Sequence, residues 1–501
     1  MIKYENDIVK IVENNRSFFE DNLREFSFDE IKKIILEIVN KLSLNFLITQ
    51  KEIFNSLNLK KIENLKIINK FLRENVLLQE IITKKSVSKK YWNTVLPFAG
   101  ISEDVIKNKF RYPLRIALFP GVSCMFYCGF CGRNQNEKYE SSVIGDGINK
   151  IKKLLNTTDE NSKISISGGL EPLTNPKIGE IIKSAYEKGF KIPLLTNGYS
   201  LTDGFIKRNP EIWKLDSLRI SLYGYDKNSY KNITRVEKSF DIVKKNLINF
   251  LILRNRLNKK LKVGLNYIIL PENMNNLTDV LEFIKDINSN VNNGKGINFL
   301  TLRDDYQSIT GHDSSLDNKR IYRLENEMTI NQRKKLLDIL QVFKEQINKL
   351  TPDIHIDYGY SLEYLSNKIF DKGLVKVSGE NLRKFGFTQM SVAVDLHGDV
   401  FLFREAGFLN RPGNKKAIIG RISDDLSLEE IIKNFLQKNE PINFNNNDAR
   451  LLDSFDHVLN ALVNQSEDNY KFGIPLSECP ISFKKFSKER SLGNNWYSDD
   501  I

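Results

Sequence analysis

Cysteine is scarce in this sequence, with 4 cysteines among 501 residues. So few thiols cannot form the disulfide framework of a small secreted protein. Long apolar runs are absent too, because none approaches the roughly 18 residues that a membrane-spanning helix needs. Residues 1–7 carry acidic side chains where a signal peptide would be apolar. These absences predict a cytoplasmic protein.

Histidine is also rare, with 4 residues. No two histidines have the spacing of a metal-binding pair, so no histidine metal site is expected. The rest of the composition, 41% hydrophobic and 28% charged, is typical of a folded protein. At roughly 150 residues per domain, the length predicts two or three domains.

The sequence first predicts a helical domain over residues 1–110. Ser27 with Glu30, and Thr49 with Glu52, have the spacing of capping boxes, and each pair precedes apolar residues at helical intervals. No strand pattern interrupts this region.

From residue 111 to about 310 the pattern changes to short apolar runs that alternate with amphipathic helical stretches. Repeated strand–helix units predict a parallel sheet, because each return to the same edge needs a helical crossover. The expected fold class is α/β, a partial (β/α)6 barrel, and not a closed eight-stranded one, since the alternation fades after Arg303. The six runs are 115–119, 163–167, 192–196, 217–222, 262–270 and 297–302.

A C-terminal extension is expected over residues 311–440. It contains a long helix at 331–350, a strand at 354–358 and a hairpin within 391–403 that turns near Gly398. Residues 441–501 are predicted to form a helical tail.

Three of the cysteines, Cys124, Cys128 and Cys131, lie within eight residues. Their loop follows the first predicted strand, at the edge where barrel folds place their chemistry. The C-x3-C-x2-C spacing can bind one 4Fe–4S cluster and leave one iron without a protein ligand. The alternative is a zinc knuckle completed by Cys479 or a histidine. We favour the cluster, because structural zinc usually uses two separated pairs of ligands.

This loop resembles that of the radical S-adenosylmethionine (SAM) enzymes, in which SAM chelates the open iron. The resemblance implies that Phe130 packs near the adenine, and that Gly168, Gly169 and Glu171 receive the SAM ammonium group. It further implies that Asn197 and Ser221, at the ends of the next two strands, contact the SAM carboxylate and ribose. The cofactor contacts that the resemblance implies are therefore Phe130, Gly168, Gly169, Glu171, Asn197 and Ser221.

Stretches between about residues 91 and 425 resemble one branch of that family, the ammonia lyases that act on nucleotide-linked aminosugars. The resemblance implies that the enzyme takes a hydrogen atom from a 4-amino-4,6-dideoxy sugar and eliminates ammonia, leaving a keto-deoxysugar. It implies a substrate linked to dTDP and a reductant such as flavodoxin or ferredoxin. The matching stretches are 91–97, 168–176, 221–224, 303–306, 355–360 and 394–408.

Polar residues beyond the later strands are the candidates for substrate binding and proton transfer. Arg303 and Arg404 suit the diphosphate, because guanidinium groups bind such oxygens in a bidentate manner. Asp305 or Glu405, with Tyr306, is expected to handle protons. Three further substrate-binding candidates are expected along one short strand, where Tyr358 and Tyr360 would share a face: Asp357, Tyr358 and Tyr360.

The C-terminal extension resembles the SPASM/twitch extension of the same family, but residues 401–404 hold no cysteine where an auxiliary cluster would be bound. One cluster is therefore expected. Cys479 is interpreted as an unliganded thiol.

A competing interpretation is a nucleic-acid-binding or RNA-modifying protein, because the formal net charge is +12. The lysines are interleaved with acidic residues along the chain, which is typical of a solvated surface, and no nucleic-acid partner is expected. Within the enzyme class, the alternatives are a radical SAM dehydrogenase, decarboxylase or epimerase that acts on a sugar nucleotide.

Overall fold

The computed structural model describes residues 4–128, 131–133, 136–270, 273–291, 295–304, 328–351 and 353–483. The described chain forms two compact units. One contains the residues up to Lys109 together with those from Val458 onward, and the other runs from Phe110 to His457. The sequence-based division differs, because it placed residues 441–501 in a separate tail.

The first unit is helical. Both capping boxes expected from the sequence are present, at Ser27 and Thr49. Apolar side chains of α3 and α5, such as Ile35 and Ile68, form its core. Its helices are α1 (Glu5–Glu13), α2 (Arg16–Asn22), α3 (Phe28–Leu44), α4 (Gln50–Ser56), α5 (Ile62–Glu74), α6 (Val76–Thr83), α7 (Lys89–Ala99), α8 (Ser102–Ile106) and α18 (Ser454–Lys471), the last of which begins in the other unit.

Hydrogen bonds from side chains to the backbone explain why the segment after α18 belongs to this unit. Arg73 Nη1 donates to the carbonyl of Cys479 at 2.8 Å, and Gln79 Nε2 donates to that of Pro480 at 2.7 Å. The amide of Ser482 returns a bond of 2.9 Å to Gln79 Oε1. Polar side chains of α5 and α6 therefore bind the backbone of residues 479–482.

The second unit is built on one ten-stranded sheet with the order β10-β9-β8-β1-β2-β3-β4-β5-β6-β7. Strands β1 to β7 are parallel to their neighbours, and β8 joins β1 in parallel as well. The strands are β1 (Arg115–Phe119), β2 (Lys163–Ile166), β3 (Pro193–Thr196), β4 (Ser217–Leu222), β5 (Lys262–Ile269), β6 (Phe299–Asp304), β7 (His355–Tyr358), β8 (Ser391–Asp395), β9 (Asp399–Phe401) and β10 (Ile418–Arg421).

The expected six-stranded partial barrel is confirmed as the centre of this sheet. Two strands assigned to the C-terminal extension, β7 and β8, instead continue it on either side. Among the described strands the edges of the sheet are β7 and β10, which do not pair with each other, so these strands form an open barrel. The hairpin is confirmed, since β8 and β9 pair in antiparallel fashion around Gly398, which has a φ of +84°.

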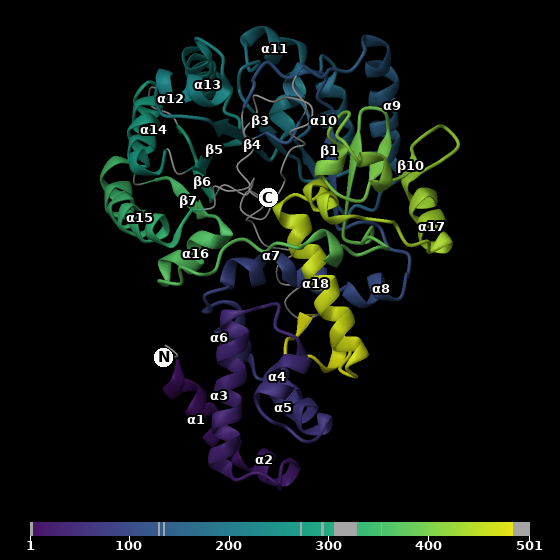
Figure 1. The fold of residues 1–501 in the computed structure, drawn as a ribbon. Helices are drawn as coiled ribbons and strands as arrows, with labels where there is room; N and C mark the ends of the chain where they lie inside the picture. Colours follow the sequence, from purple (N-terminus) through teal and green to yellow (C-terminus); the bar gives the residue numbers. More distant parts are fainter. Residues whose placement is uncertain are drawn as a thin grey trace. The chain divides into compact units, whose positions relative to one another are not determined.

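Helices lie outside the strands of this unit (Figure 1). Thr329 and Gln332 form the capping box expected before the long helix α15. The helices are α9 (Ser141–Thr157), α10 (Ile178–Glu187), α11 (Asp203–Arg208), α12 (Lys227–Thr234), α13 (Ser239–Arg256), α14 (Asp279–Ser289), α15 (Ile330–Leu350), α16 (Tyr360–Ser366) and α17 (Leu428–Lys438).

The amino-terminal part of the barrel interior is filled by an aromatic ring. Gly264 of β5 pairs with Phe299 of β6, and a Cβ atom at Gly264 would lie 2.2 Å from the ring of Phe299. The guanidinium carbon of Arg219 is 5.7 Å from the centre of the same ring. Arg219, Gly264 and Phe299 therefore fill the barrel interior on the amino-terminal side of the residues at the strand ends.

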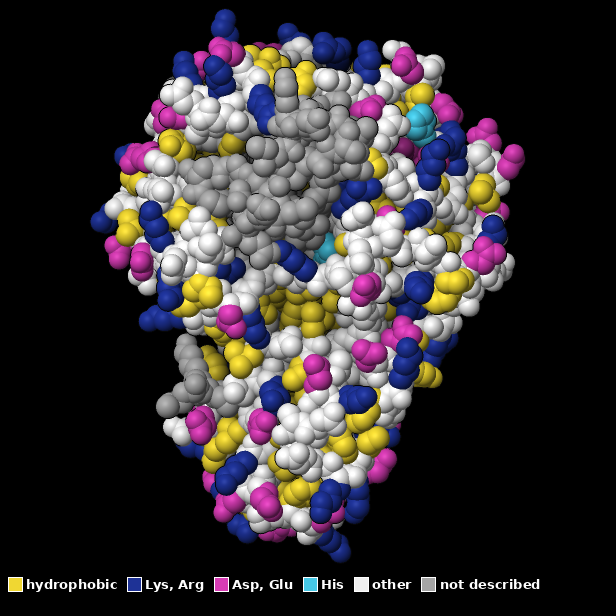
Figure 2. Space-filling model, in the orientation of Figure 1, with side chains coloured by type: hydrophobic (Ala, Val, Ile, Leu, Met, Phe, Trp, Pro, Cys, Tyr) yellow, Lys and Arg dark blue, Asp and Glu magenta, His cyan; other side chains and the backbone are white. Residues whose placement is uncertain are grey.

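None of the helices in the described part of the chain combines the length and apolar character needed to cross a membrane. On the face drawn in Figure 2, Lys and Arg side chains are interspersed with Asp and Glu.

We predict that Gly264→Ala lowers the free energy of unfolding by about 1–3 kcal/mol, because the ring of Phe299 must move to admit the new methyl group. Urea titration measures the change. Gly145→Ala is the control, since Gly145 lies in α9 with open space around it, and it should leave stability unchanged or raise it slightly. Equal effects of the two substitutions would contradict this account of the packing.

Candidate functional site

A cavity of about 200 Å³ opens at the carboxyl ends of the parallel strands in the second unit. It brings together ten of the residues proposed from the sequence, including two of the three clustered cysteines. Those ten are Cys124, Cys131, Gly168, Gly169, Glu171, Asn197, Ser221, Arg303, Arg404 and Glu405.

The cysteine loop is fixed to the barrel by one aromatic side chain and by backbone hydrogen bonds. Phe126 is buried, and its ring meets the rings of Tyr199 and Tyr223 edge to face, each at 5.6 Å. The amide of Tyr127 donates to the carbonyl of Thr234, at the end of α12, at 2.9 Å. These contacts hold Phe126 and Tyr127 against the ends of β3, β4 and α12.

The three thiols lie close enough to influence one another electrostatically. Burial raises the pKa of Cys124 to about 11, and burial and the two neighbouring thiols raise that of Cys128 well above its usual value. Arg133 opposes this effect at both cysteines. Burial lowers the pKa of Arg133, but the three sulfur atoms outweigh burial and raise it. This guanidinium therefore favours the ionised form of the neighbouring thiols.

No three His, Cys, Asp or Glu side chains converge on a single metal-ion position within the described residues. A 4Fe–4S cluster binds each cysteine at a different iron, which is a wider arrangement than a site for one ion requires.

Two glycines let the backbone after β2 approach the cavity closely. Gly168 and Gly169 have φ angles of +50° and +68°, which strain other residues. A Cβ atom at Gly168 would lie 2.8 Å from the ring of Phe119. The backbone here is therefore open to a ligand in a way that larger residues would prevent.

Glu171 is almost fully engaged within the protein. Its Oε1 accepts hydrogen bonds from the amide of Leu173 at 3.0 Å and the hydroxyl of Thr196 at 2.5 Å, and its Oε2 accepts one from the amide of Asn197 at 2.8 Å. Burial raises its pKa, while these bonds lower it. The carboxylate therefore ties the end of β3 to the loop after β2.

Asn197 connects this corner to the cysteine loop. Its side-chain amide lies 3.8 Å from Cys124 Sγ and 3.1 Å from Met125 Sδ, and it donates to both. The ends of β2, β3 and the loop after β1 are thus joined into one wall of the cavity.

Arg404 lies in a buried network of charges on another wall. Its Nη1 donates to Asp453 Oδ2 at 3.2 Å, and its Nη2 donates to the hydroxyl of Ser167. Asp453 Oδ2 also accepts a bond of 3.1 Å from Arg115 Nη2. Burial raises the pKa of Asp453, but the two arginines outweigh it and hold the carboxyl ionised. Burial and the neighbouring Asp453 raise the pKa of Asp456.

Glu405 lines the cavity next to Arg404. Burial raises its pKa to about 7, although Arg411 Nη1 lies 3.2 Å from its Oε2 and opposes the shift. Arg411 also donates to the carbonyl of Gly132, beside the last cysteine of the loop, at 2.5 Å. The carboxyl group of Glu405 can therefore exist in either protonation state near neutral pH.

Several residues proposed from the sequence are not brought into this cavity. The strand expected to carry both tyrosines ends at Tyr358, and Tyr360 begins helix α16 after Gly359, so the expectation that they share a strand face is wrong. Tyr358 pairs with Leu302, on the face opposite to Arg303, and Lys344 of α15 lies 5.3 Å from its ring.

Asp357 is buried on β7 and does not line the cavity, and neither does the buried Cys128. Phe130, Asp305 and Tyr306 lie outside the described residues.

Arg133 and Asp453 also line the cavity, and the sequence interpretation missed both. Asp453 and Asp456 bond reciprocally, with the amide of Asp456 donating to Asp453 Oδ1 at 2.7 Å. In the sequence this spacing resembles an ordinary helix cap. Arg133 follows Cys131 by two residues, and a positive charge next to three thiols was a signal that could have been used.

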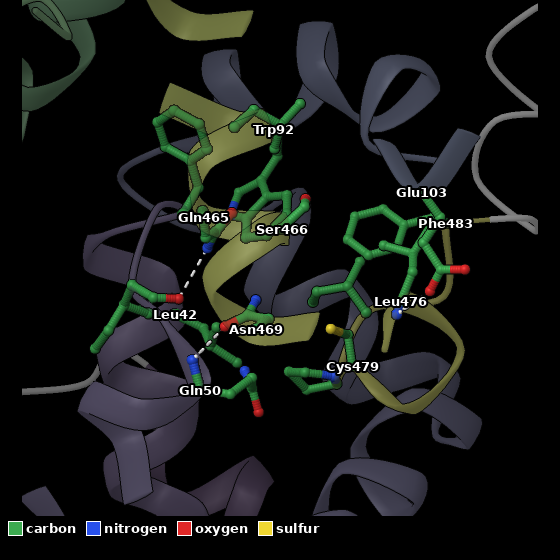
Figure 3. A pocket seen from close by; sticks show the side chains of 15 residues that line it. Leu42, Gln50, Trp92, Glu103, Gln465, Ser466, Asn469, Leu476, Cys479 and Phe483 are labelled. Carbon is green, nitrogen blue, oxygen red and sulfur yellow. Dashed lines mark hydrogen bonds between the residues drawn. The ribbon is translucent and has the colours of Figure 1, made fainter. Parts of the chain in front are cut away.

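A second cavity, of about 30 Å³, lies within the helical unit (Figure 3). It is lined mainly by apolar side chains, among them Leu42 and Trp92, and it is too small for a cofactor. Cys479 lies at its wall, where burial raises the pKa of the thiol to about 12. This cysteine is therefore an uncharged thiol that packs among helices.

The larger cavity fits an iron–sulfur cluster and a zwitterionic ligand on three observations. Three thiols share one loop with a guanidinium counterion. Two glycines expose the backbone beside them. The side-chain amide of Asn197, at the end of β3, donates to Cys124 Sγ of the same loop.

Comparisons with known proteins agree on the family of the barrel. A family model of the radical SAM superfamily matches residues 118–284. A dTDP-4-amino-4,6-dideoxy-D-glucose ammonia-lyase of Streptomyces venezuelae is 33% identical over 382 residues, which make up 75% of this chain and 76% of that protein. An S-adenosylmethionine-dependent nucleotide dehydratase of Psychrobacter lutiphocae is 26% identical over 180 residues, 34% of this chain and 59% of that protein.

Among solved structures, Streptococcus suis SuiB bound to the precursor peptide SuiA aligns with 66% of this chain and 67% of its own. The TM-score is 0.45 and the sequence identity is 13%.

We predict that Cys128→Ala abolishes both iron binding and activity after anaerobic reconstitution, because one of three ligands on the loop is lost. Iron and sulfide analysis measures the first effect. Cys479→Ala is the matched control, since its thiol lies in the helical unit, and it should retain the iron content of the wild type. Unchanged iron in Cys128→Ala would refute the assignment of the loop.

We also predict that Glu405→Gln changes the pH dependence of stability. The pKa of Glu405 is raised from 4.5 to about 7 in the folded state. The wild type therefore loses stability as the pH rises through this range, since ionisation favours the unfolded chain. Relative to the wild type, the glutamine variant should gain roughly 2–3 kcal/mol between pH 4.5 and 7.5. Urea titrations across this range measure the difference, and the exposed Glu37→Gln should show none.

Proposed function

Since the chain belongs to the radical SAM superfamily, we propose that it is an ammonia lyase that acts on a nucleotide-linked 4-amino-4,6-dideoxy sugar. The resemblance inferred from the sequence, to the family and to this branch, is confirmed by the comparisons. The observation that carries the proposal is 33% identity to the Streptomyces venezuelae ammonia-lyase over 75% of the chain. The zinc alternative is set aside, because this family uses an iron–sulfur cluster at such a loop.

The cofactors are one 4Fe–4S cluster and SAM. When bound, they supply a 5′-deoxyadenosyl radical, formed by reductive cleavage of SAM, which takes a hydrogen atom from a sugar carbon. For the sugar the elimination is redox-neutral: the hydroxyl-bearing carbon becomes a ketone, ammonia leaves, and the amino-bearing carbon becomes a methylene, because an electron from the reductant and a proton replace the hydrogen atom that was taken. The residues proposed to hold the cofactors are Cys124, Cys128 and Cys131 for the cluster, and Phe130, Gly168, Gly169, Glu171, Asn197 and Ser221 for SAM.

Arg303 and Arg404 are proposed to bind the diphosphate. Both line the cavity, from β6 and from the turn after β9. Arg404 is held by Asp453 and Ser167, so its guanidinium is fixed before a substrate arrives. A fixed guanidinium loses less entropy on binding than a mobile lysine would.

Glu405 is proposed to transfer protons. The reaction removes a proton from a hydroxyl group and leaves ammonia, so a group that titrates near neutral pH is needed beside the sugar. Burial gives Glu405 a pKa of about 7, and the bond from Arg411 fixes its orientation. Asp305 and Tyr306 remain proposals for the same task. Asp357, Tyr358 and Tyr360 have less support as substrate contacts, because none of them lines the cavity.

We further propose a dTDP-linked substrate, an electron donor such as flavodoxin or ferredoxin, and a cytoplasmic location. The substrate is proposed from the Streptomyces venezuelae relative, an ammonia-lyase of a dTDP-linked aminosugar. The location follows from the chemistry, since the four cysteines are free and a thiolate-bound cluster needs reducing surroundings.

We predict that the reduced, reconstituted enzyme releases ammonia, 5′-deoxyadenosine and a keto-deoxysugar from SAM and dTDP-4-amino-4,6-dideoxyglucose. Mass spectrometry follows the nucleoside and the sugar nucleotide, and an enzymatic assay follows ammonia. Cys128→Ala, reconstituted in parallel, provides the background.

Each product pattern decides between reactions. 5′-Deoxyadenosine with a keto-aminosugar and no ammonia would replace the lyase by a dehydrogenase. If adding the substrate yields neither 5′-deoxyadenosine nor ammonia, the proposal that the enzyme acts on this sugar would be refuted. A decarboxylase or epimerase would be indicated by carbon dioxide or by an isomer of the substrate.

A further inference from the structure

The wall of the cavity formed by β5 and β6 has no role in cofactor binding or in proton transfer as described above. The proposed cofactor contacts come from the loop after β1 and from the ends of β2, β3 and β4. Asn266 of β5 lines the cavity beyond Ser221 of β4. Its side chain is therefore free to serve another ligand.

The register of the sheet places Asn266 in a row of polar residues. Ser221 pairs with Asn266, Asn266 with Thr301, and Thr301 with Asp357. Residues paired in neighbouring parallel strands present their side chains on the same face of the sheet. Ser221 and Asn266 line the cavity, so the row lies on its inner face.

This row departs from ordinary barrel packing, in which bulky aliphatic side chains fill the interior. The residues one position earlier on these strands point to the opposite face of the sheet. They are aliphatic and fully buried: Ile220, Leu265 and Leu300. The layer below it is closed by Phe299 over Gly264. Ser221 and Asn266, at one end of this row, therefore lie on the floor of the open part of the cavity.

The amide oxygen of Asn266 has no hydrogen-bond partner, and the residue is only 7% exposed. The hydroxyl of Thr301, fully buried beside it, has none either. A buried polar atom left unpaired costs about 1–3 kcal/mol, and native proteins rarely leave one without a reason. A ligand that donates a hydrogen bond at this point would remove the cost for Asn266.

We propose that Asn266 recognises the hexose ring of the substrate by accepting a hydrogen bond from a ring hydroxyl or from the amino group. This inference rests on the proposed function and adds a specificity-determining residue to it. Arg303, the proposed diphosphate contact, lies on β6 one layer nearer the rim than Asn266. Two residues along a strand span about 7 Å, a separation that suits a hexose below its diphosphate.

The test compares the binding of a sugar nucleotide with that of the nucleotide alone. Calorimetry on the reconstituted, unreduced, SAM-loaded enzyme measures the Kd of dTDP-4-amino-4,6-dideoxyglucose and of dTDP. Asn266→Leu removes the amide with little change of volume, and Asn266→Ala is a second variant in case the first does not fold. The sugar nucleotide should bind about tenfold more weakly to both, while dTDP binds as before.

Tyr267→Phe is the matched control. Tyr267 is the next residue on the same strand, and its hydroxyl is also buried without a partner, but it lies on the opposite face of β5 and does not line the cavity. Its removal should leave both affinities unchanged.

The outcomes separate this inference from the proposed function. Equal weakening of dTDP and sugar nucleotide, weaker binding of SAM alone, or unchanged sugar-nucleotide affinity would each overturn the role of Asn266. A wild type that binds the sugar nucleotide but releases no ammonia would refute the lyase and leave Asn266 as a sugar contact. A wild type that is active while the variants bind normally would refute only the role of Asn266.

Discussion

The in-register parallel pairing of β1 to β6 is the constraint on which the rest of the structure depends. Parallel strands all end at one edge, so the loops that follow them meet there although they are up to about 180 residues apart in the chain. The cysteine loop, the two glycines after β2 and Arg303 come together for this reason alone. Loss of the register at one strand would move its inner side chains to the outer face.

Around that edge, buried charges are compensated by partners from distant segments. Asp453 accepts hydrogen bonds from Arg115 and Arg404, and Glu405 accepts one from Arg411. A buried carboxylate without such a partner would be protonated or would destabilise the fold. The same compensation fixes the arginines before a substrate binds, so stability and preorganisation have one cause.

Local patterns predicted much of the fold. Apolar runs at strand spacing gave β1 and β4 with their observed bounds, and hydroxyl–glutamate pairs gave the helix starts at Ser27 and Thr49. The prediction failed at the end of β7, where a helix begins directly after the strand. Tyr360 follows a strand and was assigned to it, but Gly359 ends the extended backbone there and a helix begins.

The sequence by itself determined the chemistry: three clustered thiols, glycines before an acid, and the family to which they belong. Only the tertiary structure decided which polar residues share the cavity with them. Asp453 looks like a helix cap until the fold brings Arg404 to it, and Asn266 looks like a polar residue within a strand until the register sets it beside Ser221. The physical reason is that residue type and spacing fix local hydrogen bonding, whereas proximity across the sheet depends on pairings between distant segments.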